Sequence, residues 1–321
     1  MPPKKKKKKT NIKDKLAYST SQLFNFAPNS YLERTSRPVY AIIFLLPFIV
    51  FYELGTILIN TEALNNVLRE SQVRVVSQVR VVAFVWLKDL LEYLGTGSQI
   101  AWIAPPFVVI LILIGLQVAS GKKWSFNTGD LPPMFVECSL LAVPLVVFGL
   151  FLNSSPQQPG ASIPVNSAIV TVDQPPPGDL HQPAGALPLA ATATVSTTQP
   201  LLPGIITGIG AGIYEELVFR LILICLLMMF FQDLLRLSHK SSIILSVLIS
   251  AALFSAHHHV GIHNGRIGQT EAFDMVKFGF RTLAGIYFAA LFAIRGFGIT
   301  AGTHACYDII AVIVNACFFR H

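Results

Sequence analysis

The stretch Leu201–Phe231, LLPGIITGIGAGIYEELVFRLILICLLMMFF, decides how this chain folds, because it is long and apolar yet carries Glu215, Glu216 and Arg220 near its middle. About 20 consecutive apolar residues cross the hydrocarbon core of a bilayer. The stretch therefore predicts a transmembrane helix. A charged side chain near the centre of such a helix costs about 2.5 to 3.5 kcal/mol, so it usually faces a protein interior or a wet cavity. The three charges predict a buried polar site.

The composition of the whole chain excludes an ordinary soluble protein. Of its 321 residues, 53% are hydrophobic and only 13% are charged, and its mean hydropathy is +0.59. We expect an all-α fold, a polytopic transmembrane helix bundle of about seven or eight spans. Seven runs are long enough to span: Val39–Ile59, Gln99–Ala119, Met134–Leu152, Leu201–Phe231, Ile243–Val260, Phe278–Ile294 and Phe297–Phe319.

An eighth element is predicted at Val79–Leu94. Charged residues interrupt this stretch at Arg80, Lys88, Asp89 and Glu92, which favours an amphipathic or interfacial helix over a span.

The amino-terminal region, residues 1–38, is predicted to be a basic cytoplasmic arm. It contains six consecutive lysines, Lys4–Lys9, followed by Lys13 and Lys15. Beside a first membrane span, such a run favours anionic headgroups over nucleic acid and fixes the amino terminus inside. We therefore expect no nucleic-acid partner and an integral protein of the cell (inner) membrane.

A segment with little apolar character divides the chain. Residues 153–200 are rich in Pro, Ser, Thr, Ala and Gln, cannot bury enough apolar surface to fold, and predict a disordered loop. The amino-terminal transmembrane helices would occupy residues 39–152. The carboxy-terminal transmembrane domain, residues 201–319, holds all the candidate chemistry.

Small residues precede the two glutamates. Gly204, Gly208 and Gly212 recur at four-residue spacing with Gly210 between them, a pattern that lets transmembrane helices approach closely. The four cysteines lie in apolar runs without CxxC spacing and are predicted to be buried small hydrophobes with no disulfide: Cys138, Cys225, Cys306 and Cys317.

Helical spacing assigns partners within the polar residues. Residues four apart share a helix face, whereas adjacent residues point about 100° apart. Glu216 and Arg220 therefore suit an intrahelical ion pair, which leaves Glu215 for chemistry. By the same rule His258 shares a face with Phe254, and Asp308 shares one with His304.

Two kinds of chemistry remain open for these groups. A carboxylate and a histidine around one water can act as general base and hydrogen-bond partner, while a second histidine and acid stabilise an oxyanion. The same four side chains, Glu215, His258, His304 and Asp308, could instead hold a divalent metal such as zinc.

The three short motifs together resemble a known family. EExxxR at Glu215, Glu216 and Arg220, then FxxxH ending at His258, then HxxxD from His304, is similar to the CPBP (Abi) intramembrane protease family. This family includes the type II CAAX prenyl endopeptidases and bacteriocin-processing or immunity proteins. The resemblance covers Leu201–Phe319 and implies a helix bundle with its active site inside the bilayer.

The resemblance also implies roles for individual residues. Glu215 is similar to the glutamate that activates water, with His258 as its partner. His304 and Asp308 match the pair assigned to oxyanion stabilisation, and Glu216 with Arg220 matches the rest of the first motif. The prenyl endopeptidases carry Asn where this chain has Asp308, which weakens any inference that the substrate is prenylated.

Other polar residues receive plainer interpretations. His257 and His259 point to other faces than His258 and are predicted to be interfacial. Glu53 and Glu137 are isolated carboxylates in or beside other spans.

The leading hypothesis is an intramembrane endopeptidase that hydrolyses membrane-associated substrates, CAAX-type or bacteriocin-like, with a Glu/His-activated water. Its partners would be a membrane-associated peptide or protein and the lipid bilayer. Two alternatives from other classes are a non-catalytic membrane scaffold or immunity protein of the same fold, and a proton-coupled transporter.

Overall fold

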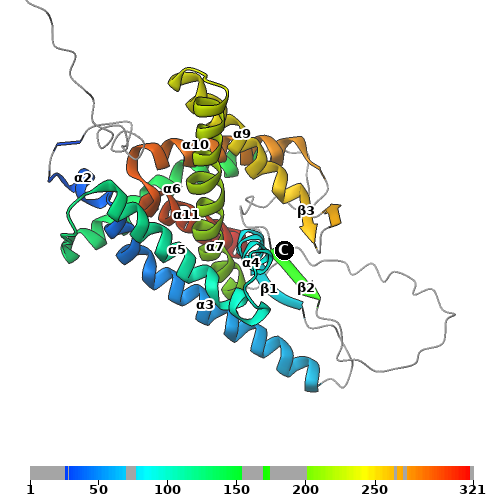
Figure 1. Ribbon diagram of the computed structural model, residues 1–321. Helices are drawn as coiled ribbons and strands as arrows, with labels where there is room; N and C mark the ends of the chain where they lie inside the picture. Colours follow the sequence, from blue (N-terminus) through cyan, green and yellow to red (C-terminus); the bar gives the residue numbers. More distant parts are fainter. Residues whose placement is uncertain are drawn as a thin grey trace, which may run out of the picture.

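The computed structural model describes residues 26–27, 29–69, 77–153, 169–173, 201–263, 266–269 and 273–318. These residues form a bundle of long helices with two small pairs of strands at one side (Figure 1). The lysine run of the predicted arm, and most of the predicted loop at residues 153–200, lie outside the described residues.

Seven helices are long and apolar enough to cross a membrane, which confirms an all-α polytopic bundle. The fourth span is one continuous helix from Leu201 to Leu234, in which α7 passes through the π-helical segment Leu217–Leu223 into α8 (Ile224–Met229) and a last π-helical turn. The long helices are α3 (Pro38–Arg69), α5 (Ser98–Ser120), α6 (Leu131–Asn153), α7 (Leu201–Glu216), α9 (His239–His259), α10 (Met275–Arg295) and α11 (Phe297–Phe318).

The stretch predicted as an eighth element divides into a strand and a short helix. Strand β1 covers Ser77–Val81, and α4 covers Val82–Tyr93. With 12 residues, α4 would be about 18 Å long, which is too short to cross a hydrocarbon core of about 30 Å. The described part of the chain therefore has seven candidate spans and not eight.

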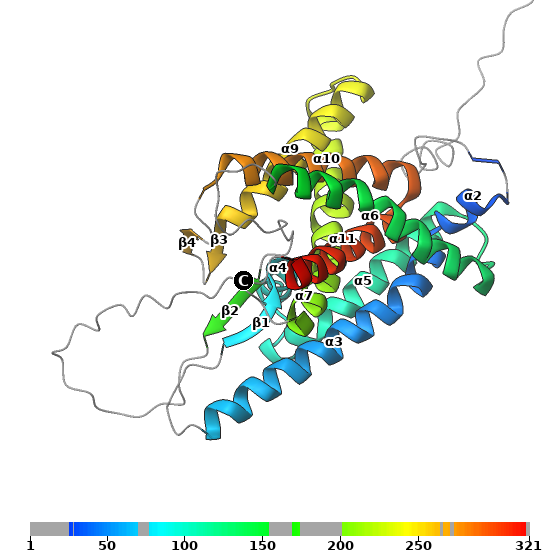
Figure 2. The same ribbon diagram turned by 180° about the vertical axis from the view of Figure 1, so that it is seen from behind.

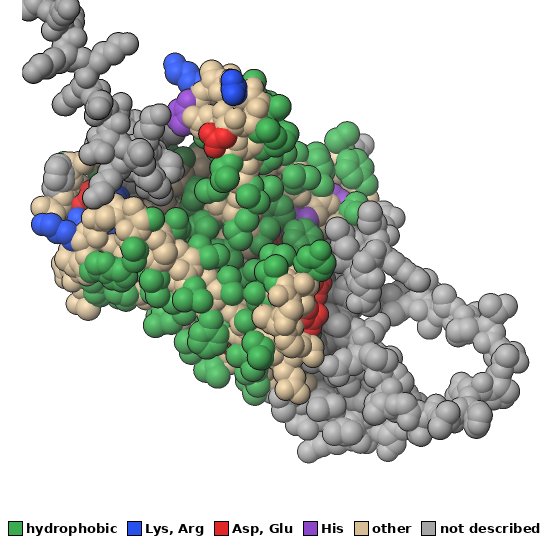
Figure 3. Space-filling model, in the orientation of Figure 1, with side chains coloured by type: hydrophobic (Ala, Val, Ile, Leu, Met, Phe, Trp, Pro, Cys, Tyr) green, Lys and Arg blue, Asp and Glu red, His purple; other side chains and the backbone are tan. Residues whose placement is uncertain are grey.

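The outer surface of the bundle is apolar. Large hydrophobic side chains are exposed along the long helices, for example Leu54 on α3, Leu111 on α5 and Leu140 on α6. Figure 3 shows hydrophobic side chains over much of one face, with Lys and Arg gathered toward its upper and left edges. An exposed apolar surface of this extent fits contact with lipid tails.

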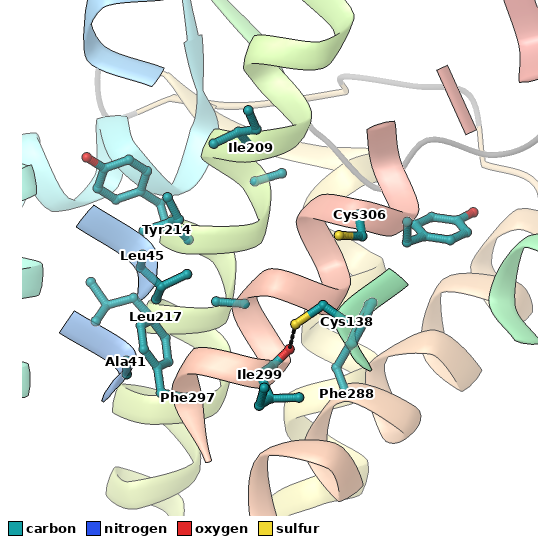
Figure 4. Packing of buried hydrophobic residues seen from close by; sticks show 14 of the residues in the cluster. Ala41, Leu45, Cys138, Ile209, Tyr214, Leu217, Phe288, Phe297, Ile299 and Cys306 are labelled. Carbon is teal, nitrogen blue, oxygen red and sulfur yellow. Dashed lines mark hydrogen bonds between the residues drawn. The ribbon is translucent and has the colours of Figure 1, made fainter. Parts of the chain in front are cut away.

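Helix α7 lies between α3 and α11 in the interior (Figure 4). A Cβ built on Gly208 would lie 2.7 Å from the Cβ of Asp308, and one built on Gly212 would lie 2.6 Å from the backbone nitrogen of Ala305. Only glycine allows such an approach, which confirms the predicted close packing. It brings the glutamates of α7 beside the polar residues of α11.

The cysteines only partly match the expectation that all four are buried. Cys138 and Cys306 are buried and free, and the Cys138 Sγ donates to the carbonyl of Ile299 (Figure 4). Cys225 and Cys317 are free but exposed, so the expectation is wrong for them. A span presents one side outward, and an apolar thiol is tolerated there as well as in the core.

Polar contacts fasten the short helix α2 (Tyr31–Thr35) to the long helices. Arg295 of α10 donates to both carboxylate oxygens of Glu137, at 2.6 and 2.8 Å, and to the hydroxyl of Thr35. The hydroxyl of Tyr31 donates to Glu137 at 2.8 Å. Glu137 was predicted to be isolated, which is wrong because its partner lies 158 residues further along the chain.

Two antiparallel strand pairs accompany the bundle. Strand β1 pairs with β2 (Ile169–Asp173), which comes from the predicted loop, with Ser77 opposite Asp173. Strand β3 (Val260–His263) pairs with β4 (Arg266–Gln269), with Val260 opposite Gln269. Seen from behind, both pairs lie on the same side of the bundle, away from α2 (Figure 2).

Candidate active site

The two adjacent glutamates end α7 in the interior of the bundle. Glu215 and Glu216 are both fully buried, and the helix widens to π geometry in the next seven residues, Leu217–Leu223. Single π-helical turns within α-helices occur frequently at functional sites. Two buried carboxylates in succession need polar partners, because an unpaired buried charge is strongly unfavourable.

Glu216 has two such partners. The Nε of Arg220 lies 3.2 Å from Glu216 Oε2, so the ion pair expected from helical spacing is present. The Nδ1 of His304, on α11, lies 2.7 Å from Glu216 Oε1, a contact between positions 88 residues apart. Glu216 thus joins the widened turn of its own helix to α11.

Aromatic rings hold the Arg220 guanidinium in place. It lies 4.1 Å from the ring centroid of Phe254 and 5.5 Å from that of Phe288, which are cation–π distances. Its Nη2 also donates to the carbonyl of Gly285 at 3.4 Å. The side chain is 1% exposed, so the charge is fixed inside the protein by α9 and α10 as well as by Glu216.

Glu215 faces the histidines at the carboxy-terminal end of α9. Its Oε1 lies 3.6 Å from Nε2 of His257. One ligand atom from each of Glu215, His257 and His258 lies within 4.8 Å of the other two. The Nδ1 atoms of His257 and His258 both lie within hydrogen-bond distance of the Phe254 carbonyl. A carbonyl only accepts, so both rings donate through Nδ1.

The position of His257 contradicts the sequence analysis. His257 and His259 were predicted to be interfacial, but they are buried, with 5% and 3% exposure. Adjacent residues diverge by about 100° inside a helix. At the last turn of α9, however, the rings of His257 and His258 both turn back to one carbonyl, with centroids 3.9 Å apart. The sequence feature that could have indicated a site shared by neighbouring histidines was the run of three histidines in the last turn of a span.

His259 lies in a different environment from its two neighbours. Its ring packs against Phe273 and Phe278, with centroids 5.2 and 6.1 Å away, and it is not part of the group formed with Glu215.

His304 and Asp308 share a face of α11, as predicted from their spacing. The Nε2 of His304 lies 3.6 Å from Oδ2 of Asp308, and both residues are fully buried. The imidazole of His304 stacks on Phe288 at 4.6 Å. Because Glu216 engages the other ring nitrogen, His304 lies between two carboxylates.

Apolar rings enclose the polar groups. Phe219 and Phe254 contact His257, with ring centroids 4.8 and 5.5 Å away. Trp86 of α4 lies 5.7 Å from the same imidazole. The short helix α4 therefore contributes to the wall of the site. Charges in such an environment interact more strongly than they would in water.

A second polar group lies immediately beside the glutamates. The hydroxyl of Tyr214 donates to Oε1 of Glu53 on α3 at 3.1 Å, and Arg80 of β1 donates to the other oxygen at 2.9 Å. The guanidinium of Arg80 also lies over Phe84, 4.5 Å from its centroid. Glu53 was predicted to be isolated, which is wrong because β1 supplies its partner.

The predicted site residues therefore lie in two adjoining groups. Glu215 and His258 belong to one, which also includes His257. His304 and Asp308 belong to the other, with Glu216. Among the described residues, His304 and Asp308 are not part of the close group of potential metal ligands, so the four-ligand set inferred from the sequence remains a prediction.

Comparison with known families found a match in the carboxy-terminal part of the chain. Residues 197–310 match the family described as "Type II CAAX prenyl endopeptidase Rce1-like", and this range contains every residue of the two groups. Searches of curated proteins and of solved structures found no match.

Proposed function

Because residues 197–310 belong to the Rce1-like family of type II CAAX prenyl endopeptidases, we propose that this protein is an intramembrane endopeptidase that hydrolyses peptide bonds of membrane-associated substrates. The family is a protease family, and seven apolar spans make the chain an integral membrane protein.

One observation carries the proposal: the buried carboxylate of Glu215 lies 3.6 Å from Nε2 of His257. This separation is too long for a direct hydrogen bond but suits a bridging water, about 2.8 Å from each atom. His257 donates through Nδ1 to Phe254, so its Nε2 presents a lone pair. The water would donate one proton to Nε2 and the other to Glu215, leaving its own lone pairs to attack a carbonyl carbon.

Glu215 acts in this scheme first as base and then as acid. As the water oxygen bonds to the scissile carbonyl carbon, its proton passes to the Glu215 carboxylate. The carbonyl oxygen gains the negative charge. When the C–N bond breaks, the protonated Glu215 returns the proton to the leaving amine. His257 and His258 position the water during both steps.

His304 polarises the carbonyl of the substrate and stabilises its developing negative charge by donating from its imidazole. Asp308, whose Oδ2 lies 3.6 Å from His304 Nε2, helps to orient the ring. Glu216 and Arg220 act as positioning residues. The 2.7 Å contact with Glu216 fixes the orientation of the His304 ring, while Arg220 partly neutralises Glu216. In the apolar surroundings, fixed groups of this kind need little reorganisation during the reaction.

The same donors fit a divalent metal. One carboxylate and two imidazoles, here Glu215, His257 and His258, form a ligand set used by catalytic zinc sites. Both histidines donate their other ring nitrogen to a backbone carbonyl, as metal-binding histidines usually do. Bound zinc would lower the pKa of a coordinated water to about 7. Metal content of the purified protein, with and without His257→Ala, tests whether it is present.

We propose that the amino terminus is cytoplasmic. If the seven spans cross the membrane in turn, the link between α5 and α6 and the link between the fourth span and α9 fall on the same side as the start of α3. Lys122 and Lys123 lie in the first link, Arg236 lies in the second, and Lys240 lies in the first turn of α9. Basic residues accumulate in cytoplasmic loops. Labelling of single cysteines introduced at positions 122 and 236 with an impermeant reagent tests the orientation, which is wrong if they react from outside the cell.

The decisive experiment replaces Glu215 by Gln, which keeps the shape and removes the base. Proteoliposomes with the Glu215→Gln variant should lose peptide cleavage by at least about 100-fold, with an unchanged melting temperature. Glu53→Gln is the matched control, because it alters another glutamate in a span and should remain active. Full activity of Glu215→Gln would refute the proposal.

Substrates can be found by comparing membrane proteomes of cells that carry the wild-type protein or the Glu215→Gln variant. Membrane-associated proteins that accumulate uncleaved only with the variant are the substrates. The presence or absence of a lipid on them decides whether CAAX-type recognition applies to a chain with Asp308.

A further inference from the structure

Strand backbone continues directly from the site. Helix α9 ends at His259, and β3 begins at the next residue, Val260. The polar site is therefore followed directly by an extended chain segment, although the long elements of the bundle are helical.

A substrate segment must lose its own secondary structure before it can be cut. In a helix the scissile carbonyl is engaged in a backbone hydrogen bond and is shielded by side chains. Unwinding a segment in an apolar environment leaves backbone N–H and C=O groups unsatisfied, at several kcal/mol for each group. An intramembrane protease therefore benefits from a backbone partner for the unwound segment.

The β3–β4 pair offers such a partner. In the described residues it is a two-stranded sheet, in which each strand pairs on one side, so the outer edge of β3 presents N–H and C=O groups to a further strand. Addition of an extended peptide to an exposed sheet edge is a general mode of peptide recognition. A strand added beside Val260 would run toward the histidines at the end of α9.

We propose that the scissile segment of the substrate binds as an extended strand along the outer edge of β3 (Val260–His263), which delivers its next peptide bond to Glu215 and His257. This inference rests on the proposed endopeptidase function and deepens it, because it specifies the conformation that the substrate adopts. Recognition then depends on backbone N–H and C=O groups of the substrate, at every second residue.

The alternation follows from strand geometry. Successive N–H groups of an extended strand point to opposite sides, so only every second amide of the substrate donates to β3. Removing a pairing donor should weaken binding, and removing its neighbour should not. A helical or irregular substrate would show no such two-residue period.

The test is a scan of one cleaved peptide in proteoliposomes with the full-length protein. Each amide on one side of the scissile bond is replaced in turn, first by an N-methyl amide and then by an ester, and the scissile bond itself stays unmodified. An ester removes the donor without adding bulk and so controls for steric effects. We expect KM to rise by roughly 3- to 10-fold at alternate positions, with the same period in both series.

Several results would overturn the inference. They are equal losses at every position, no loss at any position, or losses caused by N-methylation but not by the ester. If the unmodified peptide is cleaved but KM shows no alternation along the modified series, strand addition is rejected and the endopeptidase proposal stands. A wild-type protein that cleaves no membrane-associated peptide would reject both.

Discussion

Replacement of Gly212 by Ala tests whether the approach of α7 to α11 sets the geometry of the site. The added methyl would lie 2.6 Å from the backbone nitrogen of Ala305 and 2.7 Å from the carbonyl oxygen of Ala301. Both neighbours are backbone atoms of α11 and cannot turn aside. The helices must separate by roughly 0.8 Å to reach an ordinary contact of 3.4 Å.

Glu216 lies four residues from Gly212 on α7, and His304 lies one residue from Ala305 on α11. Separation of the two helices would lengthen the 2.7 Å hydrogen bond between Glu216 and His304 to about 3.5 Å, which is beyond the usual range of a hydrogen bond. Overpacking of this kind costs about 1 to 3 kcal/mol of stability. A displacement near 1 Å can cost about 100-fold in rate. We therefore expect turnover to fall by roughly 10- to 100-fold.

The assay combines peptide cleavage in proteoliposomes with thermal unfolding in detergent. Gly115→Ala is the matched control, because Gly115 lies within α5 and a Cβ there would have no neighbour within 4 Å. It should leave turnover unchanged and stability equal or slightly higher, since alanine favours helix over glycine by about 1 kcal/mol. Wild-type turnover and stability in Gly212→Ala would refute the reasoning.

Three further predictions concern buried charges and α2. Arg220→Leu leaves a buried carboxylate without its cation and should destabilise the protein by about 3 to 5 kcal/mol in thermal unfolding; an unchanged melting temperature would contradict the role given to this ion pair. Glu137→Ala leaves the buried Arg295 without its carboxylate and should lower the free energy of unfolding by a similar amount. The site itself is unchanged, so turnover of the protein that remains folded should be near normal. Hydrogen bonds from Arg37 lower the pKa of Glu33 below its ordinary value of about 4.5. Its contribution to stability is therefore present above pH 4.5 and is lost as pH falls through the lower pKa of the folded state. The stability difference between wild type and Glu33→Gln should therefore shrink on acidification, and a constant difference would show that the carboxylate contributes nothing.

The spans could be predicted from the sequence because their signal is local. A run of about 20 apolar residues has few stable alternatives to a transmembrane helix, and Ser98–Ser120 and Phe297–Phe318 are found close to their expected bounds. The Glu216–Arg220 contact could also be predicted, since the two residues are four positions apart on one helix. Glycines four residues apart indicated where α7 would meet another helix, though not which one.

Contacts between distant segments could not be predicted from the sequence. Glu53 pairs with Arg80 only because β1 returns to α3, and Glu137 pairs with Arg295 across most of the chain. Periodicity within one helix carries no information about either pair. The error at His257 had a different cause: the rule for adjacent residues assumes a continuing helix, whereas α9 ends two residues later and its side chains can converge.

The π-helical segment Leu217–Leu223 behaves like a one-residue insertion into the span. Removing a residue between Glu216 and Arg220 would tighten the turn to ordinary α geometry and place the arginine three residues after Glu216 instead of four, so its side chain would point in a different direction. The guanidinium of Arg220 would then leave the space between Phe254 and Phe288. The length of this helix between its acidic and basic side chains is therefore a fixed quantity, and trimming it should be more harmful than replacing almost any single apolar side chain along it.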